Sequence, residues 1–301
     1  MRLTDFGWND RFESIFNSNY NDIYTPGRVI RVDRGAVTVQ CADAVAAAVV
    51  AGTLDPAGES DWPSVGDWVA LDLAADTAVV RAVLPRMGAL CRRRPGGADQ
   101  AQAVAANVDL VLIVESVERG PNPRRIERAV ALAWDAGSTP VVVVTKTDLT
   151  NDPGGAVAKA RQGAPYSEIV AISAVDGSGM DELLGRLSPG VTAVLLGPSG
   201  VGKSTLTNRL LGEERLAISD VREGDGKGRH TTTHRELVVL PSGGCLIDTP
   251  GVRELGLWHG AEAVDTAFPE IEAAAGNCRF RDCGHRNEPG CAVTAAVAAG
   301  D

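Results

Sequence analysis

Residues 197–205, GPSGVGKST, match the phosphate-binding pattern G-x-x-x-x-G-K-[ST]. The apolar run TAVLL precedes this stretch, and the helical pattern STLTNRLLG follows it. In such a loop the glycines let backbone N–H groups surround a phosphate, Lys203 reaches the β and γ phosphates, and the Ser204 hydroxyl can bind Mg²⁺. A glycine-rich turn without a ligand is the alternative, and the flanking strand and helix argue against it. The predicted phosphate-binding residues are Gly197, Pro198, Ser199, Gly200, Val201, Gly202, Lys203, Ser204 and Thr205.

Two downstream stretches offer further groups to a bound nucleotide. Asp248 ends an apolar strand in the sequence DTPG, where its carboxylate can reach Mg²⁺ through water and the Gly251 N–H can bond a γ-phosphate. Residues 224–233, GDGKGRHTTT, are polar and glycine-rich, as expected of a mobile loop that orders over a γ-phosphate. One threonine of this loop would give the second Mg²⁺ hydroxyl. The predicted magnesium ligands are therefore Ser204, Asp248 and one of Thr231, Thr232 and Thr233.

A second motif lies upstream, at residues 145–148. TKTD follows the apolar strand PVVVV and resembles the N-K-x-D motif of GTPases, in which the aspartate accepts hydrogen bonds from guanine N1 and N2. In that motif the lysine stem lies along the base. Ser173 and Ala174, at the end of the next strand, match the companion S-A motif. The predicted base-binding residues are Thr145, Lys146, Thr147, Asp148, Ser173 and Ala174.

The two base motifs precede the phosphate loop, whereas in ordinary GTPases they follow it. This inverted order is the signature of the circularly permuted GTPases. Cutting a sheet protein at one connection and joining its former ends leaves the site unchanged in space. The sequence therefore predicts a guanine nucleotide site built on a permuted chain.

Four potential metal ligands crowd the C-terminal stretch NCRFRDCGHRNEPGC, in the pattern C-x4-C-x-H-x5-C. Three thiolates and one imidazole suit a tetrahedral structural Zn²⁺ without an open position, whereas a cluster of free thiols is the alternative. Arg279, Arg281 and Arg286 surround the cluster and could contact RNA. The predicted zinc ligands are Cys278, Cys283, His285 and Cys291.

Alternating strands and helices position the nucleotide motifs. Between the strands lie helical patterns at 123–137 and 179–187. The pattern predicts a doubly wound α/β sheet. The predicted buried strands span residues 109–114, 140–144, 168–173, 192–197, 235–240 and 244–248.

Residues 28–84 precede this pattern and show short valine-rich runs broken by Gly, Pro or Asp. About five short strands suggest a small closed barrel, for which the OB-fold is the usual choice. Such a barrel often binds RNA. A plain structural role is the alternative, because Trp62 and Trp68 are the only aromatic residues there that could stack on bases.

Net charge and hydrophobicity argue against several other classes of protein. The net charge of −10 argues against a uniformly basic nucleic-acid coat, although four arginines lie at Arg86–Arg94, in either a solvated linker or an RNA contact. No apolar run is long enough for a membrane span, and the N-terminus lacks the features of a signal peptide. We expect a cytoplasmic monomer without a membrane partner.

The barrel, the permuted GTPase motifs and the cysteine cluster, in this order, resemble the RsgA (YjeQ) family of bacterial small ribosomal subunit biogenesis GTPases. Further similar stretches are QAVAANVDLVLIV, GRHTTTHREL, DTPGVREL and EPGCAV. The resemblance implies a Mg²⁺-dependent GTP hydrolase with one structural Zn²⁺. It also implies that this hydrolase binds the 30S subunit and 16S rRNA, is stimulated by them, and assists late maturation. The predicted domains are an N-terminal barrel at 1–97, a permuted GTPase at 98–260 and a zinc-binding segment at 261–301.

The sequence departs from the GTPase pattern at several positions. Thr145 replaces an asparagine whose amide would bond guanine N7 and brace the phosphate loop. A threonine hydroxyl is shorter, so we expect a weaker preference for guanine, with Asp148 keeping the main discriminating contact. Val252 follows DTPG, where Ras-like enzymes carry a water-orienting glutamine, so His230 is our candidate catalytic residue for orienting water. A solvated loop histidine is the alternative. Only ten residues follow Cys291, where the family usually has a further helical tail, so we interpret the C-terminal segment as truncated.

Two other functions compete with ribosome-dependent GTP hydrolysis. One is a nucleotide-gated RNA-binding module with negligible hydrolysis, which subunits would not stimulate. The other is a metal-chaperone GTPase, which would carry a labile Zn²⁺, whereas a closed four-ligand site should resist a weak chelator.

Overall fold

The computed structural model of the 301-residue chain describes most residues up to position 214 and parts of the chain after it. The described residues are 2–21, 23–33, 35–52, 54, 62–74, 77–93, 101–214, 235–248, 269–280, 283–285 and 288–299.

The N-terminal strands close into a five-stranded barrel. β1 pairs with β2, β2 with β3, β3 with β5, β5 with β4, and β4 with β1 again. This closure and strand order confirm the predicted OB-fold barrel. The elements are η1 Leu3–Phe6, α1 Asp10–Asn19, β1 Thr25–Asp33, β2 Ala36–Gln40, β3 Val45–Val50, β4 Trp68–Asp72 and β5 Ala78–Val83.

Valine and aromatic side chains fill the barrel and its ends. Val29, Val39 and Val69 face the interior, since alternate residues of a strand point to the same side. Helix α1 packs Phe12 against Trp68, with ring centroids 5.7 Å apart. Trp68 is only 1% exposed, so it belongs to the core and offers no surface for base stacking.

A second run of elements builds the α/β sheet, in the order β10-β9-β8-β11-β13-β12. The strands are parallel except β12, which runs antiparallel to β13. All six predicted strands are present, with ends shifted by one or two residues. The elements are β8 Leu110–Ser116, α2 Pro123–Asp135, β9 Thr139–Thr145, η3 Thr147–Leu149, α3 Pro153–Arg161, β10 Glu168–Ala171, α4 Met180–Arg186, β11 Thr192–Leu196, α5 Lys203–Leu211, β12 Glu236–Val239 and β13 Cys245–Asp248.

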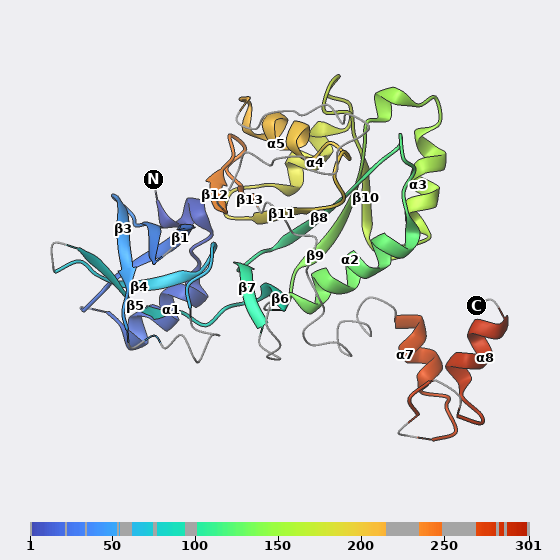
Figure 1. Ribbon diagram of the computed structural model, residues 1–301, viewed down its shortest axis with the longest axis horizontal. Coiled ribbons are helices and arrows are strands. Elements are labelled where there is room, and N and C mark those ends of the chain that lie inside the picture. The colour runs from blue at the N-terminus through green and yellow to red at the C-terminus, as the bar shows by residue number, and fades with distance from the viewer. Residues whose placement is uncertain are drawn as a thin grey trace.

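Helices cover both faces of this sheet (Figure 1). Apolar residues of α2 and α3 pack with Ile113 and Val144 on one face, and residues of α4 and α5 pack with Leu112 and Val143 on the other. Because neighbouring residues of each strand are buried on opposite faces, these strands read as continuous apolar runs. The predicted doubly wound arrangement is thereby confirmed.

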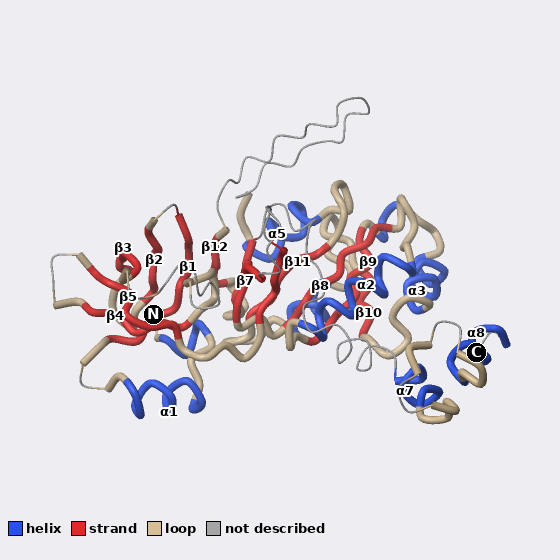
Figure 2. Tube along the Cα trace, turned by 60° about the horizontal axis from the view of Figure 1, so that its bottom comes forward, coloured by secondary structure: helices blue, strands red, loops and turns tan. Residues whose placement is uncertain are grey.

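Backbone hydrogen bonds join the barrel to the α/β sheet. β1 of the barrel pairs antiparallel with β12, so eleven of the described strands form one continuous sheet, which can be followed in Figure 2. β12 directly follows the segment that contains the predicted switch loop. The strand after that loop is therefore bonded to the barrel.

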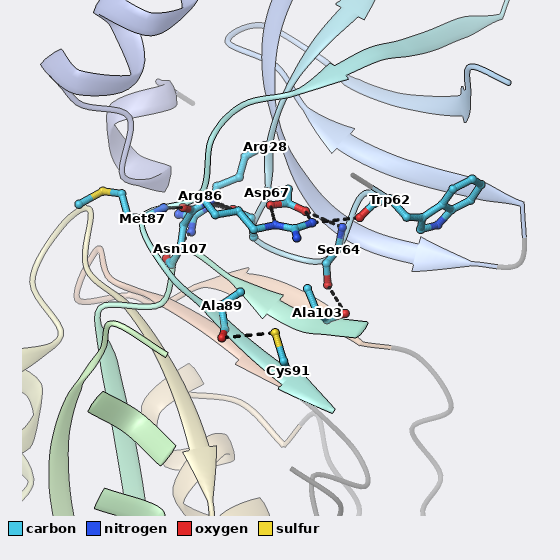
Figure 3. A network of polar contacts seen from close by, with 11 residues as sticks. Arg28, Trp62, Ser64, Asp67, Arg86, Met87, Ala89, Cys91, Ala103 and Asn107 are labelled. Carbon is cyan, nitrogen blue, oxygen red and sulfur yellow. Dashed lines mark hydrogen bonds and ion pairs between the residues drawn. The ribbon is translucent and has the colours of Figure 1, made fainter. Parts of the chain in front are cut away.

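A buried arginine fastens the same junction (Figure 3). Arg28 is 1% exposed, and its guanidinium donates to the backbone oxygens of Gly66 and Asn107 and to the Thr192 hydroxyl, at 2.9–3.1 Å. Burial lowers the pKa of Arg28. Since Thr192 begins β11, whose other end carries the phosphate loop, Arg28 ties the barrel to the strand beneath the nucleotide site.

The arginine-rich stretch after the barrel is partly structural. Arg86 forms an ion pair with the fully buried Asp67, at 2.7 Å, and Asp67 also accepts from the Ser64 N–H (Figure 3). Two strands that we did not predict follow, β6 Ala89–Arg93 and β7 Ala101–Ala106, and they pair with each other. Arg86 is therefore neither a solvated linker residue nor a free RNA contact.

The C-terminal helices are α7 Pro269–Ala275 and α8 Ala292–Ala299, which contact each other and flank the cysteine cluster. No helix within the described ranges is long and apolar enough to cross a membrane.

Candidate functional site

The predicted nucleotide residues lie at one edge of the α/β sheet. Strands β8, β9, β10, β11 and β13 are parallel, so their carboxyl ends meet at the same edge. Thr145 ends β9, Gly197 follows β11, Asp248 ends β13, and Ser173 lies two residues after β10. Such an edge is where open α/β sheets bind their ligands.

The phosphate loop connects β11 to α5 and depends on its first glycine. Gly197 has a φ of +153°, and a Cβ at this position would lie 2.4 Å from the Val114 carbonyl oxygen of β8. Only glycine fits this close approach. Helix α5 begins at Lys203, and its Leu206 and Leu210 are buried against the sheet. The buried face of α5 thus fixes the position of its N-terminus next to the loop, and the N-terminus of a helix favours a bound anion.

Lys203 belongs to the predicted phosphate loop, residues 197–205, and is the first residue of α5. Its Nζ donates to the carbonyl oxygens of Gly197 and Pro198, at 2.8 and 2.7 Å. The ammonium therefore lies on the inner side of the loop, together with the N-terminus of α5. Both features favour a bound anion.

Thr145 links the base motif to the phosphate loop. Its side chain is 2% exposed, and Oγ1 lies 2.6 Å from the Val201 carbonyl oxygen and 3.0 Å from that of Glu115. A threonine hydroxyl is shorter than the asparagine amide of the GTPase motif, from which we expected a weaker preference for guanine. The structure brings the hydroxyl into hydrogen-bond distance of the loop, because the end of β9 lies directly under Gly202.

Asp148 is oriented by the next strand. The buried Ser173 donates its hydroxyl to Asp148 Oδ1 at 2.6 Å and accepts from the N–H groups of Val175 and Asp176. The stretch 173–176 thus holds the Asp148 carboxylate in one orientation. A fixed carboxylate can accept from two adjacent N–H groups of a base.

Two charged residues in the turn after β8 were missed from the sequence. The Glu118 carboxylate pairs with Lys146 Nζ, which lowers the pKa of Glu118, and Arg119 Nη1 donates to the Ser199 carbonyl oxygen at 2.9 Å. The turn therefore bridges the base motif and the phosphate loop. Its position directly after a buried strand is the signal that could have found it.

Several predicted residues cannot be placed against this edge. His230, Thr231, Thr232, Thr233 and Gly251 lie outside the described residues. The backbone of Asp248 is described, and β13 lies beside β11, so Asp248 and Gly197 come to the same edge. The catalytic histidine and the threonine ligand of Mg²⁺ remain predictions.

The four predicted zinc ligands come together near the C-terminus, and their ligand atoms lie within 4.8 Å of one another. His285 Nδ1 lies 3.6 Å from Cys278 Sγ and 3.5 Å from Cys291 Sγ, and the two sulfurs are 4.0 Å apart. A tetrahedral zinc with bonds of about 2.3 Å to sulfur separates its ligand atoms by about 3.8 Å. The cluster therefore fits a zinc ion.

Backbone N–H groups donate to the sulfur atoms of two of these cysteines. The N–H of Ala292 donates to Cys278 Sγ, and that of Thr294 to Cys291 Sγ, both at 3.3 Å. Hydrogen bonds from Thr294 lower the pKa of Cys291 to about 6. A thiolate is the form that binds zinc.

Comparison with known proteins agrees with this geometry. The model of the RsgA GTPase family matches residues 83–258. A protein of Streptomyces coelicolor named small ribosomal subunit biogenesis GTPase RsgA is 44% identical over 301 residues, which cover 99% of this chain and 82% of that protein. A protein of the same name from Xylella fastidiosa is 49% identical over 78% of this chain and 68% of its own length.

Two solved structures share the fold. The crystal structure of YjeQ from Thermotoga maritima has a TM-score of 0.68 and 27% identity, with 92% of each chain covered. That of YloQ, described as a circularly permuted GTPase, has a TM-score of 0.64 and 24% identity, covering 94% of this chain and 91% of its own. The match over residues 83–258 and the 44% identity over nearly the whole length show that the chain belongs to the RsgA GTPase family.

Proposed function

We propose that this protein binds GTP with Mg²⁺, hydrolyses it to GDP and phosphate, and acts in small ribosomal subunit biogenesis. The observation that carries the proposal is the hydrogen bond from Thr145 to the Val201 carbonyl, which joins the base motif to the phosphate loop at one sheet edge. Thr145 and Val201 are 56 residues apart in the sequence, so this bond brings the two motifs together at one place on the sheet. The GTPases named among its relatives support the same reading.

Each group has a proposed role. Lys203 and the N–H groups of residues 197–205 bind the phosphates, whereas Ser204 and Asp248 hold Mg²⁺, which would neutralise charge between the phosphates. The Asp148 carboxylate reads guanine N1 and N2, with Lys146 and Ala174 beside the base. His230 orients the attacking water, and one of Thr231, Thr232 and Thr233 completes the Mg²⁺ site.

The proposed partner is the 30S subunit with its 16S rRNA, in the cytoplasm. We assign RNA contact to the barrel segment, residues 1–97, and to the zinc segment, residues 261–301, around the GTPase segment, residues 98–260. The bonds between β1 and β12 support this division of work, because they connect the barrel to the strand that follows the switch loop. Loss of the γ-phosphate would release the protein from the subunit.

We expect isolated 30S subunits to raise the steady-state rate of GTP hydrolysis severalfold. The physical reason is that no glutamine follows DTPG, so the protein alone positions the attacking water poorly. The measurement is phosphate release from GTP and from ATP, with and without subunits. ATP should give no stimulated rate, and 50S subunits serve as the matched control. An unchanged rate with 30S subunits would favour a nucleotide-gated RNA-binding module.

We also expect the protein to carry about one Zn²⁺ per chain, because the four ligand atoms fit a closed tetrahedral site. Cys278→Ser should lower the zinc content to well below half an equivalent. Cys91→Ser, which changes a thiol of β6 outside the cluster, should leave it unchanged. Metal content is measured by atomic absorption after dialysis against a weak chelator. Rapid loss of zinc from the unmodified protein would support the metal-chaperone function instead.

A further inference from the structure

The Thr145 hydroxyl faces two acceptors and has one hydrogen. Its oxygen lies 2.6 Å from the Val201 carbonyl oxygen and 3.0 Å from the Glu115 carbonyl oxygen. A carbonyl cannot donate, so the hydroxyl must donate to one of them. The shorter distance assigns the hydrogen to Val201, in the phosphate loop.

This hydrogen is not free to turn toward a ligand. Both residues of this hydrogen bond are buried, because Thr145 is 2% exposed and Val201 is 1% exposed. Turning the hydroxyl away would leave the Val201 carbonyl without this bond, and a buried unpaired acceptor is costly. The remaining lone pairs of the hydroxyl oxygen can only accept.

Guanine presents donors on one edge and acceptors on the other. N1–H and the 2-amino group are donors, whereas O6 and N7 are acceptors. The carboxylate of Asp148, held by Ser173 at 2.6 Å, suits the donor edge. N7 can only accept a hydrogen bond, and the single hydrogen of the Thr145 hydroxyl is already donated to the Val201 carbonyl oxygen.

We propose that Thr145 is a positioning residue for the phosphate loop, and that this protein recognises guanine without a hydrogen bond from residue 145 to N7. This inference rests on the proposed binding of guanine nucleotides. An asparagine at the same position would behave differently, because its amide has two hydrogens and could serve the loop and N7 together.

The test compares GDP with 7-deaza-GDP, in which a C–H group replaces N7, by equilibrium competition binding. The protein should bind both nucleotides with affinities within twofold of each other. Thr145→Asn should bind 7-deaza-GDP about three- to tenfold more weakly than GDP, the size of one neutral hydrogen bond. A preference for GDP of more than twofold in the unmodified protein that disappears in Thr145→Val would overturn the proposal, because the Thr145 hydroxyl would then donate to N7.

Two further variants test the positioning role. Thr145→Val has the same shape without the hydroxyl and should weaken both nucleotides equally, by about five- to tenfold. Thr145→Ser should restore the affinity, and Thr139→Val, at the exposed start of the same strand, is the matched control. Unchanged affinity in Thr145→Val would overturn the positioning role. If the unmodified protein binds neither nucleotide, it is the proposed function that fails, and GDP binding alone reveals this.

Discussion

Replacing Lys203 with alanine is expected to weaken GTP binding about a thousandfold and to abolish measurable hydrolysis. Nζ makes two hydrogen bonds, to the carbonyl oxygens of Gly197 and Pro198, from a position inside the phosphate loop. Phosphate oxygens would replace these neutral acceptors by charged ones, and two charge-assisted bonds contribute about 4 kcal/mol. The measurement is equilibrium binding of a non-hydrolysable GTP analogue, together with phosphate release.

The control shows whether the loss of affinity depends on the position of the lysine inside the loop or only on the loss of one positive charge. Lys159→Ala removes an exposed lysine of α3 and should leave binding unchanged. Thermal unfolding of Lys203→Ala should stay close to that of the unmodified protein, because the lysine is only partly buried and its backbone partners remain. A loss of affinity below about tenfold would contradict the assignment of residues 197–205 as the phosphate site.

Much of the fold could be predicted because its signals are local. The strands β8, β9 and β11 are buried on both faces, so each can be recognised as an apolar run without any knowledge of its neighbours. The phosphate loop is also a local signal, since its pattern lies within residues 197–205 between an apolar run and a helical pattern. The cluster of three cysteines and one histidine could be predicted because all four residues lie within 14 residues of sequence.

The junction between barrel and sheet could not be predicted, because its contacts join distant parts of the chain. Arg28 bonds to Thr192, 164 residues away, and β1 pairs with β12 across more than 200 residues. Nothing in the local pattern of Arg28 distinguishes it from an exposed strand arginine. Arg119 was missed for the same reason, since only the folded sheet brings its turn to Ser199.

Thr145 shows how a correct motif can still be read incompletely. The sequence shows a departure from asparagine, from which we expected a weaker preference for guanine. The distance of 2.6 Å to the Val201 carbonyl depends on how closely β9 approaches the loop, which no spacing in the sequence reports. The residue type therefore predicts which hydrogen bonds a side chain can make, whereas the fold determines which partner lies within reach.

The second large effect is expected from Asp148→Asn, which should reverse the preference of the protein from GTP to XTP. Guanine carries a 2-amino donor where xanthine carries a 2-oxo acceptor. A carboxylate only accepts, whereas an asparagine amide accepts from N1–H and donates to the 2-oxo group. The Ser173 hydroxyl, which donates to Oδ1 at 2.6 Å, can also donate to the amide oxygen and would hold the new side chain in place.

The size of this reversal depends on whether the group at position 2 of the base finds a hydrogen-bond partner in the side chain of residue 148. A site built to bond a polar group rejects an analogue with the wrong group by a factor on the order of 10⁴. Competition between GTP and XTP should therefore favour GTP in the unmodified protein and XTP in Asp148→Asn. Asp152→Asn makes the same change at the N-cap of α3, where either side chain can accept from the Gly155 N–H, and should leave the preference unchanged. If Asp148→Asn still preferred GTP, the base would not lie against this carboxylate, and the guanine site would have to be sought elsewhere on the sheet edge.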